Sequence, residues 1–415
     1  MPDLELGSFK LPRLNLASPQ FQANPYRAYD IYRAREPVHW GISQNPDLPG
    51  CWYLFRYSDV LAGLKDPRLG RERPGPSLAN QSPDPFAVPN NDWLIYRDPP
   101  YHTGLRDWLK NALTQQLVEA FRPRLEDYAL NLIGSFPPAG PVDFISQFAE
   151  KLPAVTLAGL LGFEPDKASF FARCAIYMLA PSWQINRSPF EQELAYSRAY
   201  ATLSHLLRDL VAERKSVPRP DLMTRLIFTQ QQFRAFDEAE LVSNALLFLI
   251  TGYHVAVNLL GNGWLALLEH PAQVEQWRAG ILRPGPAVEE LLRYESPLQM
   301  VDRWVLQDLE IGGKNFRRGD RVYLILGAAN RDPARFQQPG NLELDREKNI
   351  HLAFGAGLHT CLGANFVRLQ AAVAFNLLLE RLGNLETVGP PPSWQTNPNF
   401  RALNHLLFNY TLKEA

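Results

Sequence analysis

One cysteine stands out because glycines surround it: Cys361 lies in the segment FGAGLHTCLG, residues 354–363. A helical pattern begins directly after this segment, so backbone N–H groups and the helix dipole would lower the pKa of the Cys361 thiol. The glycines permit positive φ and a close approach of the backbone to a flat ligand. A thiolate bound to iron donates electron density through the metal and favours O–O cleavage. The alternative is a buried free cysteine in a glycine-rich turn.

The decapeptide resembles the haem-binding loop of the cytochrome P-450 family, in which Phe, Gly, Gly, Cys and Gly occur at this spacing. The resemblance implies a haem b (iron protoporphyrin IX) cofactor with Cys361 as the axial ligand of the iron. It also implies that Phe354, Gly355 and Gly363 contact the cofactor. Further motifs of the family occur in the same order between residues 98 and 363, so the resemblance covers nearly the whole chain.

The motif ELLR places Glu290 and Arg293 three residues apart on a predicted helix, where they share a face and can pair. Taken alone, the pair predicts a surface salt bridge of little energetic value. The motif also resembles the ExxR helix of the family, in which the pair is buried near the cysteine loop. There it is tied to an irregular segment that corresponds to residues 330–345 here. The resemblance implies a role for both residues in folding and haem retention.

Four basic residues match family positions that contact the haem propionates. His102 and Arg106 are four residues apart in the segment DPPYHTGLR, which resembles the start of a haem-flanking helix. Taken alone, this segment predicts a capped, solvated helix start. Arg303 follows the ExxR helix, and His359 lies two residues before the cysteine. Two buried carboxylates need cationic or N–H partners, and these side chains could supply them.

The predicted helix over the oxygen side departs from the family pattern. The family carries a small residue, a glycine, a variable residue, an acid and a threonine, whereas this chain has TGYHV at residues 251–255. Thr251 and Gly252 keep the first two positions, and Gly252 would permit a local kink. His254 replaces the acid and could deliver a proton near neutral pH. Val255 replaces the threonine and cannot form a hydrogen bond with its side chain.

Three types of reaction compete for this distal site. Substrate-bound water or a substrate hydroxyl could replace the threonine, and ordinary monooxygenation would proceed. Oxidative coupling or ring closure could join substrate radicals without oxygen insertion. The site could also use hydrogen peroxide or isomerise a peroxide, with His254 as the acid–base group. A haem protein that binds a ligand without turnover is a further alternative, and His254 could equally be an inter-helix histidine that points away from the haem.

The composition limits the other classes of function. The chain has 415 residues, a net charge of −1 and a pI of about 6.7, which argues against a general nucleic-acid binder. Three dispersed cysteines form neither a disulfide framework nor a zinc motif, so we expect a reducing cytoplasm. There is no signal-peptide pattern. The most apolar stretch, residues 245–250, is too short for a membrane span.

The elements that must hold these residues are mainly helices. Apolar spacing predicts helices over residues 119–136, 191–213, 237–270 and 365–381. Residues 303–311, 321–326 and 403–412 read as strands, with Gly312 and Gly313 in a turn. Residues 332–349 have no regular pattern. We therefore expect an α+β fold that is mainly α with small sheets. The resemblance implies one domain over residues 1–415, a triangular helical prism around a buried haem.

The family positions that line the substrate pocket correspond to residues 83–95, 175–183, 247–255, 298–301 and 399–406. Many of their side chains are apolar or aromatic, which suits a hydrophobic or aromatic small molecule. Core packing is the alternative for each of them. Our specific candidates for contact with the substrate are Trp93, Phe248, Leu298, Met300 and Val301.

Neither a flavin nor a nicotinamide motif is present, because the FGAG segment lacks the strand–turn–helix unit and the downstream acid of a dinucleotide site. Electrons would then come from a separate ferredoxin or flavodoxin with its reductase. We expect a monomer that binds neither nucleic acid nor a membrane. Basic residues on the cysteine side could form the docking patch for the redox partner, although simple solvation explains them equally well: Arg106, Lys110, Arg122, Lys348 and Arg368.

Overall fold

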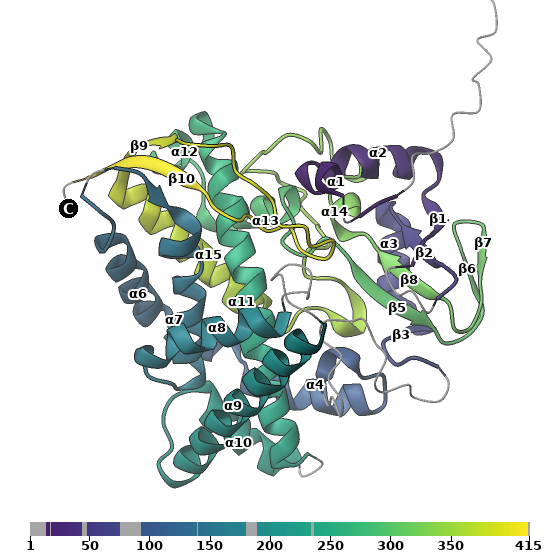
Figure 1. The fold of residues 1–415 in the computed structure, drawn as a ribbon, viewed down its shortest axis with the longest axis horizontal. Helices are drawn as coiled ribbons and strands as arrows, with labels where there is room; N and C mark the ends of the chain where they lie inside the picture. Colours follow the sequence, from purple (N-terminus) through teal and green to yellow (C-terminus); the bar gives the residue numbers. More distant parts are fainter. Residues whose placement is uncertain are drawn as a thin grey trace, which may run out of the picture.

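The computed structural model describes residues 14–16, 18–43, 48–74, 93–138, 140–179, 189–233 and 236–413. Helices α6 to α10 gather on one side of the molecule, and the largest sheet lies on the other (Figure 1). Helix α11 runs between them, and α15 lies alongside it. The α+β class predicted from the sequence, mainly helical with small sheets, is confirmed.

The longest helix, α11 (Glu238–Leu268), organises the helical side. Asp237 caps it by accepting a hydrogen bond from the backbone N–H of Glu240, and the Glu240 carboxylate returns one to the backbone of Asp237. Pro271 follows its end and opens the next helix. The other helices on this side are α4 (Tyr101–Ala112), α5 (Gln115–Ala120), α6 (Arg122–Gly134), α7 (Lys151–Leu161), α8 (Ala168–Leu179), α9 (Pro189–Ser216), α10 (Leu222–Phe233), α12 (Pro271–Arg278), α13 (Pro284–Tyr294) and α15 (Ala364–Arg381).

The helix predicted over residues 119–136 is divided in two. Helix α5 ends at Ala120, and α6 begins at Arg122, directly before Pro123. Proline lacks an N–H donor, so it is tolerated in the first turn of a helix but not in its interior. The predictions for α9, α11 and α15 are confirmed to within a few residues of their ends.

The sheets are small and mostly antiparallel. The five-stranded sheet has the order β1-β2-β8-β5-β3, in which β2 and β8 are parallel. Helices α1 (Pro19–Ala23), α2 (Pro25–Arg35), α3 (Tyr57–Lys65) and α14 (Leu326–Ala329) complete this side. The strands of this sheet are β1 (Val38–Gly41), β2 (Cys51–Leu54), β3 (Leu69–Gly70), β5 (Val301–Val305) and β8 (Arg321–Leu324).

Two further sheets lie at the periphery. Strands β6 (Leu309–Ile311) and β7 (Lys314–Phe316) form a hairpin around Gly312 and Gly313, both at positive φ. The turn predicted there is confirmed. Strands β4 (Val142–Asp143), β10 (Leu407–Leu412) and β9 (Leu382–Thr387) form a three-stranded sheet. Strand β10 begins four residues later than the C-terminal strand predicted over residues 403–412.

The main hydrophobic core surrounds α11, which contributes buried residues along nearly its whole length. We expected no apolar segment long enough to cross a membrane. Within the described residues, α11 meets that measure by length and composition, because it continues past Gly252 to Leu268. Of its most apolar window, 61% is buried inside the protein, so core packing accounts for its apolar sequence.

Candidate active site

The Cys361 loop packs against α3 and leads along the chain into α15. The backbone N–H of Cys361 donates to the carbonyl oxygen of Phe354 over 3.0 Å, which closes the loop. Gly355 and Gly357 adopt φ values of +69° and +73°. A Cβ at Gly357 would lie 2.6 Å from the carbonyl oxygen of Leu64, so only glycine lets the loop approach α3 this closely.

The surroundings of Cys361 have opposing effects on whether its side chain is a thiol or a thiolate. Burial raises the pKa of the thiol, while the backbone N–H groups of Gly363 and Ala364 and the positive charge of Arg106 lower it. The residue nevertheless keeps an exposed surface. The two other cysteines are buried, and desolvation raises the pKa of both Cys51 and Cys174 to about 11. Cys361 is therefore the cysteine suited to ligand chemistry.

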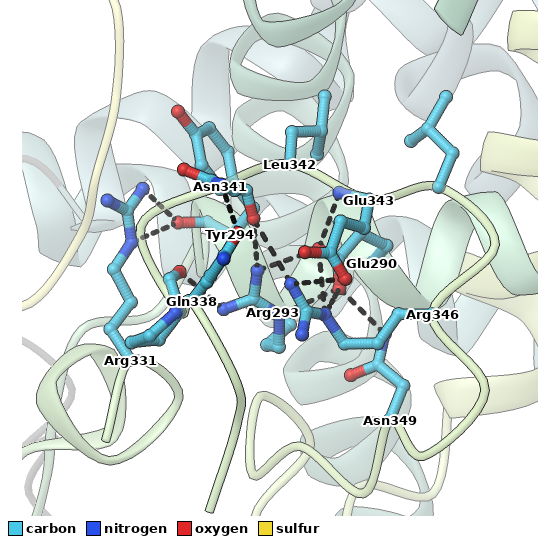
Figure 2. Close-up of polar contacts among 12 residues, drawn as sticks. Glu290, Arg293, Tyr294, Arg331, Gln338, Asn341, Leu342, Glu343, Arg346 and Asn349 are labelled. Carbon is cyan, nitrogen blue, oxygen red and sulfur yellow. Dashed lines mark hydrogen bonds and ion pairs between the residues drawn. The ribbon is translucent and has the colours of Figure 1, made fainter. Parts of the chain in front are cut away.

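The pair Glu290 and Arg293 is buried, and both side chains have 0% exposure. Arg293 donates two hydrogen bonds of 2.7 Å to the Glu290 carboxylate. Its remaining N–H groups reach the backbone carbonyls of Asn330, Pro339 and Asn341, in the irregular segment named from the sequence. Figure 2 shows these contacts converging on the pair. The surface salt bridge predicted from the spacing alone is thus excluded.

This network also supports the Cys361 loop. Arg293 binds the carbonyl of Asn330, and the Asn330 side chain accepts a 2.6 Å hydrogen bond from the backbone N–H of Leu352. Leu352 in turn accepts from the backbone N–H of Gly355. Arg346, which sequence reasoning missed, donates to the Glu290 carboxylate over 3.1 and 3.2 Å (Figure 2). The pair is therefore linked to the cysteine loop by consecutive hydrogen bonds.

The four predicted propionate partners come together beside the loop. The rings of His102 and His359 lie 4.3 Å apart, and His359 Nε2 lies 3.9 Å from a carboxylate oxygen of Asp98. Arg106 donates a 2.5 Å hydrogen bond to the carbonyl of Thr360, the neighbour of Cys361. Arg303 is buried on β5, and its positive charge lowers the pKa of His359.

This cluster is short of negative charge. Burial and the neighbouring Arg71 lower the pKa of Arg303 to about 9. Burial, Arg303 and His102 lower the pKa of His359 to about 2. Arg71 was not predicted from the sequence, because its position depends on the pairing of β3 with β5. It forms a 2.6 Å ion pair with Asp302, which lies beside Arg303.

The residues fit a haem with two carboxylates. His102 is fully buried, yet neither ring nitrogen has a hydrogen-bond partner in the part of the chain that the structure describes. Such a group costs free energy unless a ligand binds it. A propionate pair would satisfy His102 and supply the negative charge that Arg303 and His359 lack. Cys361 at the start of α15 would supply the axial thiolate.

One face of α11 carries the residues predicted for the oxygen side of the haem. Phe248, Thr251, Gly252 and Val255 recur at three- and four-residue spacing and are half-buried, although most neighbouring residues of the helix are buried. Thr251 donates its hydroxyl proton to the carbonyl of Leu247 over 2.7 Å. The helix runs through Gly252 without interruption, and a Cβ there would lie 3.1 Å from Leu157. Gly252 thus permits the close approach of α7.

His254 points toward α8. Its Nε2 lies 3.0 Å from the backbone carbonyl oxygen of Ala175, so this nitrogen is the donor. Its ring stacks on Phe400, with centroids 6.1 Å apart and planes 30° apart. Burial lowers its pKa to about 4. This histidine therefore lies between elements and is neutral near pH 7.

The five candidates for substrate contact divide into two groups. Leu298 and Val301 are half-buried, as is Phe248, which packs on Phe366 of α15. Trp93 is 1% exposed and belongs to the main core. The backbone N–H of its neighbour Leu94 donates a hydrogen bond to the side-chain oxygen of Asn244 of α11. Met300 is 3% exposed.

For Met300 the structure favours core packing, the alternative considered from the sequence. Met300 packs into a separate cluster with Tyr29, Phe55 and Tyr323. Leu298 and Val301 pack instead against a different cluster, which includes Leu54 and Val322. Of the predicted lining segments, residues 83–92 and 180–183 lie outside the described residues.

The proposed docking patch is only partly available. Arg122 pairs with Glu119, and Arg368 makes two hydrogen bonds to Glu289 while it covers the ring of Phe354 at 4.5 Å. Lys110 and Lys348 are exposed.

Comparison with known proteins gives consistent matches along the chain. A family model described as Cytochrome P450 matches residues 286–401. The polyketide biosynthesis cytochrome P450 PksS of Bacillus subtilis (strain 168) is 32% identical over 93% of this chain and 96% of that protein. The structure of P450BioI in complex with an acyl carrier protein ligated to hexadec-9Z-enoic acid has a TM-score of 0.84 and 31% identity, covering 95% of this chain and 100% of that chain. CxnD, described as a cytochrome P450 enzyme for C–S bond formation in chuangxinmycin biosynthesis, has a TM-score of 0.83 and 30% identity, covering 94% of this chain and 96% of that chain.

Proposed function

This chain belongs to the cytochrome P450 family, and we propose that it is a haem-thiolate monooxygenase acting on a hydrophobic, aromatic small molecule of secondary metabolism. Cys361 would bind the iron of haem b. His102, Arg106, Arg303 and His359 would bind the propionates. Several bacterial relatives with related roles support this assignment, among them the polyketide enzyme PksS.

The observation that carries the proposal is the position of the Cys361 thiol beside the cationic cluster. Arg106 reaches the carbonyl of Thr360, one residue before the cysteine, and the ring of His359 packs at a tilt against the buried His102. A sulfur ligand next to an excess of buried positive charge suits a flat cofactor that carries two carboxylates. A structural cysteine in a glycine-rich turn would need neither the charge excess nor the partnerless His102.

When bound, the haem would supply the activation of dioxygen. The backbone N–H groups of Gly363 and Ala364 would help to stabilise a negative charge on the Cys361 sulfur, in opposition to the burial that raises the pKa of the thiol. Glu290 and Arg293 keep the loop in place through Asn330 and Leu352. These residues would hold the cofactor on the side of Cys361, and none of them needs to transfer a proton.

On the distal side, the proton must come from a source other than the usual side chains. Val255 has no polar atom, and the N–H of His254 is engaged by the carbonyl of Ala175. The hydroxyl of Thr251 donates to Leu247 but can still accept a hydrogen bond from water. We therefore assign proton delivery to ordered water or a substrate hydroxyl next to Thr251 and Val255.

A second candidate function is oxidative coupling or ring closure without net insertion of oxygen. Val255 and His254 favour this function, because neither side chain delivers a proton to the site. A site with poor proton delivery is suited to reactions of substrate radicals. The relative CxnD, described as forming a C–S bond, adds support. Under this function the half-buried apolar face of α11 would hold two reacting groups side by side.

Isotope labelling separates the two functions. The haem-loaded protein is supplied with a ferredoxin, ferredoxin reductase, NADPH and labelled dioxygen, and aromatic metabolites are screened both free and attached to an acyl carrier protein. Monooxygenation predicts a product that carries one labelled oxygen atom. A coupled product without label supports the second function. Failure to form product with these redox partners, together with turnover on hydrogen peroxide, would overturn the monooxygenase proposal, and binding without any product would overturn both.

The remaining assignments follow from the family and the surface. We propose electron delivery by a ferredoxin or flavodoxin with its reductase, with Lys110 and Lys348 in the contact. We further propose a cytoplasmic monomer with one domain over residues 1–415. Chemical cross-linking of a ferredoxin to Lys110 and Lys348 tests the surface.

A further inference from the structure

His254 occupies a position where the catalytic proposal gives it no task. It lies on α11 between Tyr253 and Val255, within one turn of the half-buried distal face. Its contacts reach two other elements, both far away in the sequence. These are α8, through Ala175, and the C-terminal segment that leads into β10, through Phe400.

The contact with α8 is directional. A backbone carbonyl can only accept, so the hydrogen on Nε2 of His254 must point at the oxygen of Ala175 over the 3.0 Å separation. Ala175 is buried and lies four residues before the end of α8 at Leu179. The bond therefore fastens the last turn of α8 to the middle of α11.

The contact with Phe400 involves the face of the imidazole. The two rings are 6.1 Å apart and nearly parallel, which is a favourable offset arrangement. Phe400 is buried and pairs through its backbone with Leu298, one of the half-buried candidates for substrate contact. Its neighbour Arg401 is fixed by the carboxylate of Glu295 over 3.2 Å. The segment thus offers His254 a firm surface.

We propose that His254 is a latch that holds α8 and the Phe400 segment against α11 and so sets the width of the passage to the distal face. The latch consists of His254, the carbonyl of Ala175 and the ring of Phe400. It rests on the proposed function, because the passage matters only if a ligand reaches a haem beside Val255. His254 is in this sense a positioning residue and not the proton donor of the reaction.

The latch predicts an effect that depends on ligand size. Imidazole and 4-phenylimidazole both bind ferric haem through a ring nitrogen and shift its Soret band, but the second must pass a wider opening. Loss of the His254 hydrogen bond in His254→Phe should speed binding and release of 4-phenylimidazole by about two- to tenfold, the range expected for one neutral hydrogen bond. The rates for imidazole should stay within about twofold of the wild-type values.

Two further variants give the controls. His254→Gln keeps an N–H donor at a similar reach and should restore most of the wild-type rate. Tyr253→Phe removes a neighbouring hydroxyl that has no hydrogen-bond partner within the described residues, and it should change neither ligand's rates. Stopped-flow absorbance on the ferric haem-loaded protein measures the wild type and the three variants without any turnover, so these results do not depend on which reaction the enzyme performs.

The proposal is overturned if His254→Phe leaves both ligands unchanged, or if it changes both equally, since the effect would then arise at the iron. A measurement on the unmutated protein covers the case in which a variant does not fold. In the diamagnetic carbon monoxide complex, nitrogen-15 NMR of labelled histidines should show His254 as a neutral ring protonated on Nε2. A ring protonated on Nδ1 alone would contradict the latch.

Discussion

Replacing Glu290 with glutamine removes the charge at the centre of the buried network. The carboxylate accepts two hydrogen bonds of 2.7 Å from Arg293 and two longer ones from Arg346. It also accepts 3.0 Å bonds from the backbone of Glu343 and the side chain of Asn349. In Glu290→Gln two guanidinium groups would face a neutral amide, and one of its two polar atoms would itself be a donor.

Removing one partner of a buried ion pair costs about 3–5 kcal/mol. Domains are stable by about 5–15 kcal/mol, so this loss is a large fraction of the total. We expect the free energy of unfolding in urea to fall by that amount. Haem should be lost in parallel, because Arg293 supports the Cys361 loop through Asn330 and Leu352. The ratio of Soret to protein absorbance follows haem retention.

Glu343→Gln is the matched control. Its carboxylate also pairs with Arg346, over 3.1 Å, but the side chain is 41% exposed. An exposed pair contributes about 0–1 kcal/mol, so this variant should keep its haem and nearly all its stability. Equal losses in the two variants, or a loss below about 1 kcal/mol in Glu290→Gln, would refute the assignment of a buried structural charge.

Three other predictions concern the haem contacts and the distal helix. The pKa of His254 is lowered from 6.5 to about 4, so only the unfolded chain takes up a proton at this residue as the pH falls from 6.5 to 4. Over this range the free energy of unfolding of the wild type should fall relative to that of His254→Gln by up to about 3 kcal/mol. Parallel pH profiles of the two proteins would contradict this. His102→Leu should release haem to apomyoglobin roughly tenfold faster than wild type, since it removes a charge-assisted hydrogen bond, and an unchanged rate would exclude a propionate contact. Val255→Thr adds a hydroxyl to the distal face and should lower the share of electrons lost as hydrogen peroxide by roughly twofold or more, and an unchanged share would place this position outside the proton path.

The proximal side could be predicted from the sequence because its signals are local. The glycines around Cys361 lie in one decapeptide, and the positive φ values of Gly355 and Gly357 follow from the residue type. Glu290 and Arg293 share a face at any helix position. Their burial could not be read from spacing, because it depends on the segment that contains Asn341 and Arg346, far along the chain.

The distal side was less predictable because its geometry depends on tertiary packing. The ring of His254 could face the haem or α8, and the position of Ala175, 79 residues away, decides between them. Met300 is apolar and lies next to half-buried residues, yet it packs into the cluster that contains Tyr323 of β8, a contact that spacing along the chain does not predict. Arg71 joins the cationic cluster only through the pairing of β3 with β5.

The central claim is that Cys361 binds haem iron as a thiolate, and the carbon monoxide difference spectrum of the reduced, haem-loaded protein tests it most directly. We predict a Soret band with the strong red shift of thiolate ligation, and its loss in Cys361→Ser. Cys51→Ser and Cys174→Ser should keep the band, because both thiols are buried away from the loop. A wild-type Soret band without the red shift, or one that survives in Cys361→Ser, would contradict the account.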